Sequence, residues 1–176
     1  MPYVPPPELA SLTLAQTAGL VAARQLPPVE QWRPEREGDS KMRIASDGRW
    51  FHDGGEIARP AMVRAFASLL RRDGDGSHWL VTPYEKLAIA VEDAAFIATD
   101  VARQDDALAF RLNTDELVIA GPDHPLTARG ETALYLAVRH GTEARINRST
   151  WLQLAELADP DGSVTSQGAR FPLAAT

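Results

Sequence analysis

Three polar side chains near the C-terminal end of this 176-residue sequence, Arg145, Asn147 and Arg148, have the types and spacing to bind an anion. On a helix, with about 100° between successive residues, Asn147 and Arg148 fall on the apolar face that Trp151 forms. Arg145 falls near the edge of that face. A guanidinium buried there is costly without a carboxylate, a carbonyl or a ligand as partner. We therefore expect the three residues to bind an anionic small molecule near the helix N-terminus. The alternative is that Arg148 snorkels, with its charged end in water, or closes a salt bridge with a carboxylate of the sheet.

A second group of candidate ligand-binding residues lies earlier in the chain. Arg59 precedes Pro60, and a residue before proline favours an extended backbone, so its side chain could enter a groove between a hairpin and a helix or stay exposed. Thr82, Glu85 and Lys86 surround a turn that links two halves of the chain. A rigid structural linker is the alternative interpretation of that turn.

Two histidine–aspartate pairs offer a different chemistry. His52 is followed by Asp53, and Asp123 is followed by His124. If such groups converged in one cleft, they could act as the general base of a hydrolase-like enzyme on a small molecule. A third hypothesis is a protein–protein interaction module, which would expose a sheet edge or an apolar patch of several hundred Å².

Several sites of known chemistry are excluded by the residues. The chain has no cysteine, which excludes disulfides, zinc thiolate sites and iron–sulfur clusters. Its four histidines lack metal-ligand spacing, and the Asp-Gly repeat at 73–76 lacks the glycine and glutamate that a helix–loop–helix calcium loop requires. Glycine-rich phosphate loops are also absent. We therefore expect no metal, no cofactor and no catalytic residue that a familiar motif would identify.

Composition and charge narrow the class of protein. The chain is 44% hydrophobic with a formal net charge of −6, and the deficit lies in residues 89–176, which carry 13 acidic and 7 basic side chains. Nucleic-acid binding needs a basic face, so we expect no nucleic-acid partner. No run of about 18 apolar residues and no secretory signal are present, so we expect no membrane partner and a cytoplasmic location.

The elements that must position these residues follow from periodicity and turn signals. Short strands spaced by tight turns favour antiparallel pairing, and each sheet has an amphipathic helix to cover it. We therefore predict an α+β fold of two small antiparallel-sheet units, each with a packed helix. Strands are predicted at 41–45, 49–52, 78–82, 85–91, 96–103, 107–112, 116–120 and 133–139, and helices at 8–24, from Pro60 to before Asp73, and at 143–158.

The predicted organisation has four parts. They are an N-terminal extension at 1–40, a hairpin–helix–strand unit at 41–84, an antiparallel meander with a C-terminal helix at 85–160, and a flexible tail at 161–176. A short echo between residues 55–59 and 141–145, at an offset of 86, raises the hypothesis of two related strand–turn–helix units.

The order and spacing of five segments resemble a known family. They are Asp47–His52, Gly55–Arg59, Leu80–Lys86, Val91–Asp93 and Val138–Arg148. Together they are similar to the bacterial family named domain of unknown function 1285, over about residues 32–158. The resemblance implies a two-part α+β fold, somewhat like pleckstrin-homology substructures, and a ligand-binding role in bacterial signal transduction. It implies no activity, and it marks Arg59, Thr82, Glu85, Lys86, Glu143, Arg145, Asn147 and Arg148.

Overall fold

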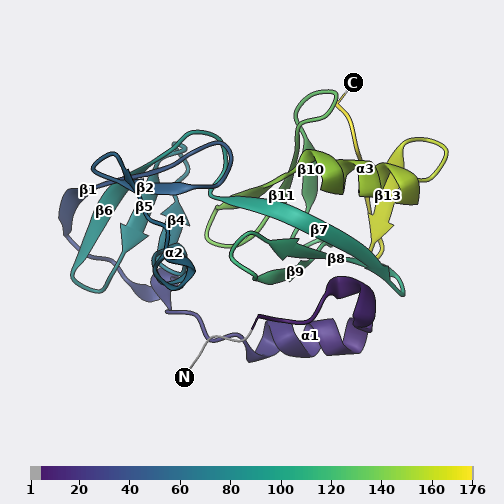
Figure 1. Cartoon of the computed structure of the whole chain (residues 1–176), viewed down its shortest axis with the longest axis horizontal. Coiled ribbons are helices and arrows are strands. Elements are labelled where there is room, and N and C mark those ends of the chain that lie inside the picture. Colours follow the sequence, from purple (N-terminus) through teal and green to yellow (C-terminus); the bar gives the residue numbers. More distant parts are fainter. Residues whose placement is uncertain (1–4, 176) are drawn as a thin grey trace. The chain divides into compact units, whose positions relative to one another are not determined.

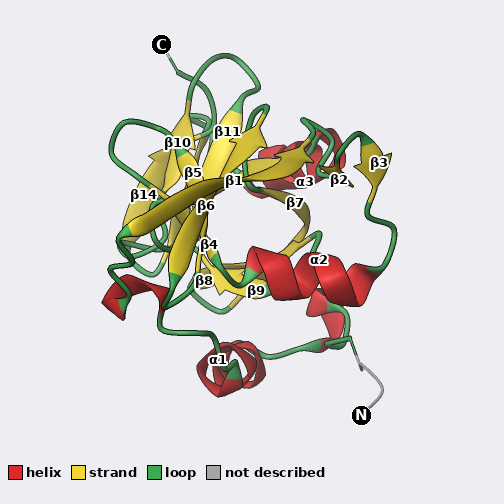
Figure 2. Cartoon of the chain, turned by 90° about the vertical axis from the view of Figure 1, so that its left-hand side faces the viewer, coloured by secondary structure: helices red, strands yellow, loops and turns green. Residues whose placement is uncertain are grey.

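The computed structural model describes residues 5–175 and confirms the α+β class (Figure 1). Within those residues, strands outweigh helices and form two six-stranded sheets and one two-stranded sheet (Figure 2). The chain divides into two compact units. The first sheet unit is Gln25–Phe96 with Arg139–Glu143, and the second sheet unit is residues 5–24, Ile97–Val138 and residues 144–175.

The first sheet unit contains one helix and six strands. Its core joins the helix to the sheet, because Trp50 is buried and stacks on Phe66 with ring centroids 6.4 Å apart. Pro60 opens that helix, as predicted, and Arg59 is its N-terminal flanking residue. The elements are β1 (Arg36–Ile44), β2 (Trp50–His52), β3 (Gly55–Glu56), α2 (Pro60–Ala67), β4 (Leu70–Arg72), β5 (His78–Val81) and β6 (Glu85–Val91).

The second sheet unit contains two α-helices and the remaining strands. Its core is built from side chains such as Phe110, Leu134 and Ile146, which are fully or almost fully buried. The elements are η1 (Leu9–Ser11), α1 (Leu14–Ala23), β7 (Phe96–Gln104), β8 (Ala107–Leu112), β9 (Leu117–Ile119), β10 (Leu126–Ala128), β11 (Leu134–Ala137), β12 (Glu143–Ile146), α3 (Arg148–Leu157), β13 (Ser163–Ser166) and β14 (Ala169–Pro172). The short turn η2 (Val29–Gln31) belongs to the first unit.

The two large sheets share one strand order. The first is β3-β2-β1-β6-β5-β4, and the second, read from its other edge, is β9-β8-β7-β12-β11-β10. Each is therefore two three-stranded meanders joined through the first and sixth strands. We predicted antiparallel sheets, but β1 and β6 of the first sheet run parallel. These two strands belong to different meanders and are far apart in the sequence. The turn lengths, which indicate how neighbouring strands pair, therefore gave no information on the direction of this pair.

The predicted helix at 143–158 begins too early. Residues Glu143–Ile146 form strand β12, in which Ala144 and Ile146 are buried while Glu143 and Arg145 are half-buried. The helix α3 starts only at Arg148. Four residues are too few to distinguish the alternation of apolar residues in a strand, with a period of 2, from the helical period of 3.6. A short strand directly before a helix is therefore easily assigned to the helix. The echo between residues 55–59 and 141–145 falls on strands that do not correspond in the two sheets, β3 in the first and β12 in the second. It therefore does not reflect the strand order that the two sheets share.

The C-terminal segment is more ordered than we expected over its described residues, which end at 175. Residues 161–176 were predicted as a flexible tail, but β13 and β14 form an antiparallel hairpin that buries Val164, Phe171 and Leu173. Its turn places Gln167 and Gly168 at positive φ, the geometry of a two-residue hairpin loop. At the other end, α1 lies beside β8 and β9 (Figure 1).

The division between the units differs from the expected one. We expected a boundary near residue 85, whereas the units divide between Phe96 and Ile97, because β6 pairs with both β1 and β5. None of the helices described here has the length and apolar content needed to cross a bilayer.

Candidate functional site

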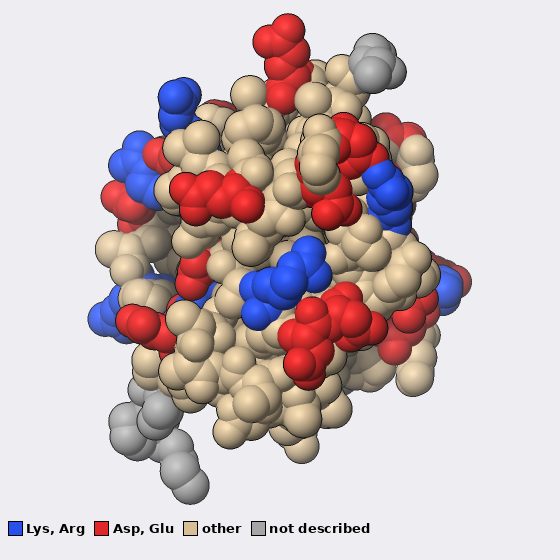
Figure 3. All heavy atoms as spheres, turned by 90° about the vertical axis from the view of Figure 1, so that its right-hand side faces the viewer, with Lys and Arg blue, Asp and Glu red and all other residues tan. Residues whose placement is uncertain are grey.

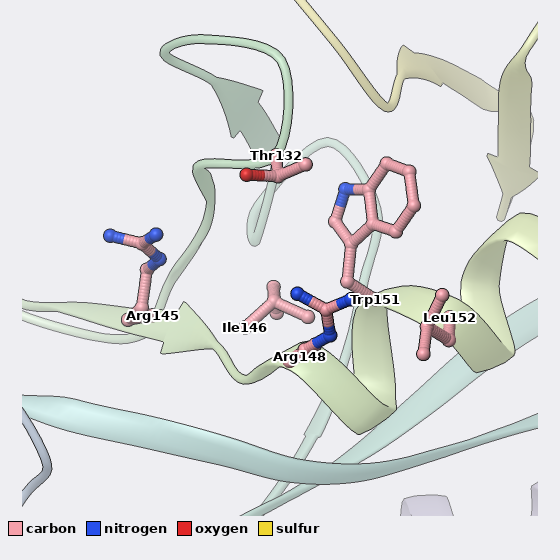
Figure 4. A pocket seen from close by; sticks show the side chains of 6 residues that line it. All are labelled: Thr132, Arg145, Ile146, Arg148, Trp151 and Leu152. Atoms are coloured by element: carbon pink, nitrogen blue, oxygen red, sulfur yellow. The ribbon is translucent and has the colours of Figure 1, made fainter.

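A cavity of about 300 Å³ lies in the second sheet unit, where β12 leads into α3. The strand and helix supply all but one of its described lining residues, and the loop between β10 and β11 supplies the other. In Figure 4 the Arg148 guanidinium stands beside Trp151, while Arg145 extends from the strand at the other end of the hollow. The lining residues are Thr132, Arg145, Ile146, Arg148, Trp151 and Leu152.

The Arg145 side chain at this cavity is held in place by contacts with Tyr135. It lies on the half-buried face of β12, where its Nη1 donates to the Tyr135 hydroxyl at 3.1 Å. Its guanidinium also lies 5.3 Å from the centroid of the Tyr135 ring, and the guanidinium of Arg129 lies 4.4 Å from the same centroid. Cation–aromatic contacts of this kind restrict the rotation of long side chains. Arg145 is therefore a preorganised donor.

Arg148 is a cation of a different kind. We expected it on a buried face, and that expectation is wrong: Arg148 is exposed at the first position of α3. The reason is that Thr150 and Leu154 form the buried face of α3, and at 3.6 residues per turn Arg148 lies on the opposite face of the helix. Among the described residues, Arg148 has no hydrogen-bond or ion-pair partner, so the alternative of a salt bridge to the sheet is not realised in residues 5–175.

Asn147 is near the cavity in sequence but is committed to the helix. It is the N-cap of α3, and its Oδ1 accepts from the backbone amide of Thr150 at 2.9 Å and from the Ser149 hydroxyl at 3.1 Å. It is not among the described lining residues. An asparagine before a polar first turn is a common N-cap signal, and it would have located the helix start correctly.

The apolar wall of the cavity was not predicted as part of a site. Trp151 is half-buried, and its Nε1 donates to the carbonyl of Leu173 at 3.3 Å, so the segment after β14 orients the indole. Ile146 is 2% exposed, and Leu152, which follows Trp151 in α3, is 49% exposed. Leu173, in a segment that we expected to be flexible, thus helps to shape the site.

The charge of the cavity is opposite to that of its surroundings. None of its described lining residues is acidic, and two are arginines. The half of the chain that contains it carries 13 acidic and 7 basic side chains. On the face drawn in Figure 3, acidic side chains form several clusters with fewer basic ones between them. A local excess of guanidinium groups in an acidic region favours one anionic group at this position.

The other candidate residues belong to the first sheet unit and do not line this cavity. Arg59 is exposed before α2. Thr82 organises its own turn, because its Oγ1 accepts from the amide of Glu85 and donates to the Glu85 carbonyl, both at 3.1 Å. Lys86 is paired with Glu37 at 3.3 Å.

A second, more open hollow lies in the first sheet unit, and its charges are already paired. It is lined by Glu30, Arg33, Arg71, Arg72, Asp73 and His140. Arg71 donates to both carboxylate oxygens of Asp73, and Arg72 donates to Glu143 at 2.9 Å. His140 lies 3.6 Å from Glu30, and burial lowers the pKa of its imidazole. Mutual pairing of this kind stabilises the fold and leaves few donors for a ligand.

Neither histidine–aspartate pair is among the described lining residues of the two hollows. His52 lies 3.6 Å from Asp53 in an exposed turn of the first unit. His124 belongs to the second unit, where its Nδ1 lies 3.0 Å from the carbonyl of Ala137. Within residues 5–175, no group of three or more acidic or histidine side chains is placed to hold a metal ion.

Comparison with known proteins identifies relatives over almost the whole chain. Two family models match: "Domain of unknown function (DUF1285), N-terminal domain" over residues 27–94, and "Protein of unknown function (DUF1285), C-terminal domain" over residues 95–173. A crystal structure of a DUF1285 family protein from Silicibacter pomeroyi is 38% identical, with a TM-score of 0.78, covering 94% of this chain and 97% of that one.

A second crystal structure shares the fold at lower identity. It is a DUF1285 family protein from Shewanella baltica, 22% identical with a TM-score of 0.57, covering 67% of this chain and 92% of that one. A search of curated proteins gave no match.

Proposed function

The chain belongs to the DUF1285 family, and from that premise we propose that it is a binding protein for a small anionic molecule, held in the cavity between β12 and α3. One observation carries the proposal. Arg148 projects an unpaired guanidinium at a cavity whose other cation, Arg145, is already held by Tyr135, and no described lining residue is acidic. Guanidinium groups bind carboxylates and phosphates through two parallel hydrogen bonds, so the pair can grip an anionic group.

The two arginines divide the work of binding. Arg145 is fixed before a ligand arrives, so little conformational entropy is lost when it donates to an anion. Arg148 is exposed and can close on the ligand afterwards. Its place in the first turn of α3 adds the favourable dipole of a helix N-terminus. A protein that binds in this way, with no assembled acid–base groups at the cavity, suits the regulatory role in signalling that the family resemblance implies.

A thermal-shift experiment tests the proposal. The wild-type chain and the variants Arg148→Ala and Arg59→Ala are melted with acetate, benzoate or inorganic phosphate. Arg59 is a matched control, because it is also an exposed arginine at the start of a helix but lies in the other unit. At about 100 times its dissociation constant, a ligand adds roughly 2.7 kcal/mol, which raises the melting temperature by several degrees.

We expect at least one of these anions to stabilise the wild type and Arg59→Ala but not Arg148→Ala. Without ligand, both variants should melt close to the wild type, since neither arginine has a described partner to lose. The proposal fails if no anion stabilises the wild type, or if Arg148→Ala keeps the full shift.

A further inference from the structure

The proposed function leaves the ligand unspecified, and we infer that it is a monocarboxylate joined to a flat apolar body, such as an aromatic acid. This inference rests on the proposed function, and it comes from the uneven lining of the cavity. The lining mixes the guanidiniums of Arg145 and Arg148 with the apolar side chains of Trp151, Ile146 and Leu152, and in Figure 4 the Arg148 guanidinium stands beside the Trp151 ring. A ligand that contacts both kinds of residue must itself be amphipathic.

The apolar residues of the lining suit a ring. The indole N–H of Trp151 is already donated to the Leu173 carbonyl, so the ring offers the cavity its surface rather than a hydrogen bond. The same hydrogen bond fixes the indole plane, and a fixed aromatic plane favours a stacked flat partner. Leu152 is 49% exposed although it is a large apolar side chain, so a bound apolar body would remove part of its surface from water.

The cationic residues suit a single negative charge. One guanidinium, such as that of Arg148 beside Trp151, supplies two parallel N–H donors for the two oxygens of a carboxylate. A phosphate dianion has three unprotonated oxygens and a second charge, and glycine-rich loops and helix N-termini hold such groups with several backbone amides. The described lining contains no glycine and no lysine. Placing a strongly hydrated dianion against the apolar wall would also cost more desolvation than placing a carboxylate there.

The size of the cavity sets the size of the body. About 300 Å³ is the lower end of the range for ligand pockets. A compound of one or two rings with a carboxylate fits that range, while a dinucleotide or a long acyl chain would extend beyond it.

Isothermal titration calorimetry with three anions tests the inference. Two of them are monocarboxylates of equal charge, and the third has a higher charge. Benzoate carries the carboxylate and a ring, acetate carries the carboxylate alone, and inorganic phosphate carries more charge and no ring. We expect benzoate to bind at least about tenfold more tightly than acetate and more tightly than phosphate. In Leu152→Ser the benzoate affinity should fall about three- to tenfold while the acetate affinity stays unchanged, because only the apolar wall is altered.

A second variant guards against a fold defect. Trp151→Phe keeps an aromatic face and should retain most of the preference for benzoate. The inference is overturned, with the proposed function intact, if phosphate or acetate binds as tightly as benzoate, or if Leu152→Ser leaves the preference unchanged. Absence of binding by all three anions would instead overturn the proposed function itself.

Discussion

Asn147 shows how a single side chain can position a candidate binding site without being among its described lining residues. Its Oδ1 satisfies the Thr150 amide and thereby fixes where α3 begins, which sets the direction of Arg148 at the next position. At this scale the positioning of the site is therefore a capping effect, and capping residues are separable from binding residues by mutation.

Replacing Asn147 by alanine should cost stability rather than ligand contacts. Loss of the cap should lower the free energy of unfolding by about 1 kcal/mol, while Asn147→Asp should keep it, because a carboxylate also caps and favours the positive end of the helix. Urea denaturation checks both variants. A fully stable Asn147→Ala that no longer binds benzoate would show that Asn147 contacts the ligand after all.

At the scale of elements, the turn at Arg139–Thr142 is tightly constrained in the first sheet unit. Gly141 has a φ of +80°, and a Cβ built on it would lie 2.4 Å from the carbonyl oxygen of Arg72, whose amide donates to the His140 carbonyl. The backbones of the turn and of β4 therefore approach as closely as glycine allows. A side chain at this position must displace one of them.

Gly141→Ala should destabilise the chain more than Gly162→Ala. Both glycines have a φ near +80°, so both substitutions carry the cost of about 1–2 kcal/mol for a left-handed residue with a Cβ. Only Gly141 adds the contact with Arg72, because a Cβ on Gly162 would meet no atom within 4 Å. Parallel urea titrations give the two values. Equal losses of stability would contradict the close approach of this turn to β4.

The elements also show what could be predicted from the sequence. Strands with clear alternation or a tight turn, such as β7 and β8, were predicted nearly to the residue, and Pro60 marked α2. The strands β12 and β10 were missed because three or four residues give no period. At the site, Arg145 and Arg148 were chosen for their chemistry, whereas Thr132, Ile146 and Leu152 were not. Apolar or neutral lining residues look like any others until the fold brings them together.

At the scale of the whole molecule, the two units use one strand order but place their helices differently. In the first unit α2 lies between the third and fourth strands, and in the second unit α3 follows the sixth. The candidate ligand cavity depends on that difference, since it forms where the sixth strand passes directly into a helix. In the first unit the sixth strand is not followed directly by a helix, and the hollow of that unit is lined with charged side chains that pair with carboxylates.

The pH dependence of stability should reflect the histidines of the first unit. Burial lowers the pKa of His78, with Arg72 adding to the effect, and burial lowers the pKa of His140 more than the Glu30 carboxylate raises it, with Arg139 and Arg71 also lowering it. An unfolded chain protonates at the ordinary pKa of about 6.5 and the folded chain only at lower pH. The unfolded state then holds more protons, so the free energy of unfolding should fall as the pH is lowered through that range.

The variant His78→Gln/His140→Asn should flatten this dependence. Asparagine suits position 140 because the backbone there has a φ of +51°, which asparagine tolerates well. Urea denaturation midpoints at pH 7.5, 6.5 and 5.5 check the prediction. All three pH values lie above the range in which exposed carboxylates titrate, so the histidines dominate the change. An unchanged slope in the double variant would mean that other groups set the pH dependence.

The most direct test of the central proposal is a titration followed by the indole N–H signals in a nitrogen-15 correlation spectrum. The chain has four tryptophans, of which Trp151 lies at the cavity and Trp32, Trp50 and Trp79 lie in the first sheet unit. With benzoate as the probe and Trp151→Phe to assign the signal, we predict that the Trp151 signal alone shifts, in a saturable way. A shift of Trp32 or Trp79 with Trp151 unmoved would place the anion site in the other unit and contradict the proposal.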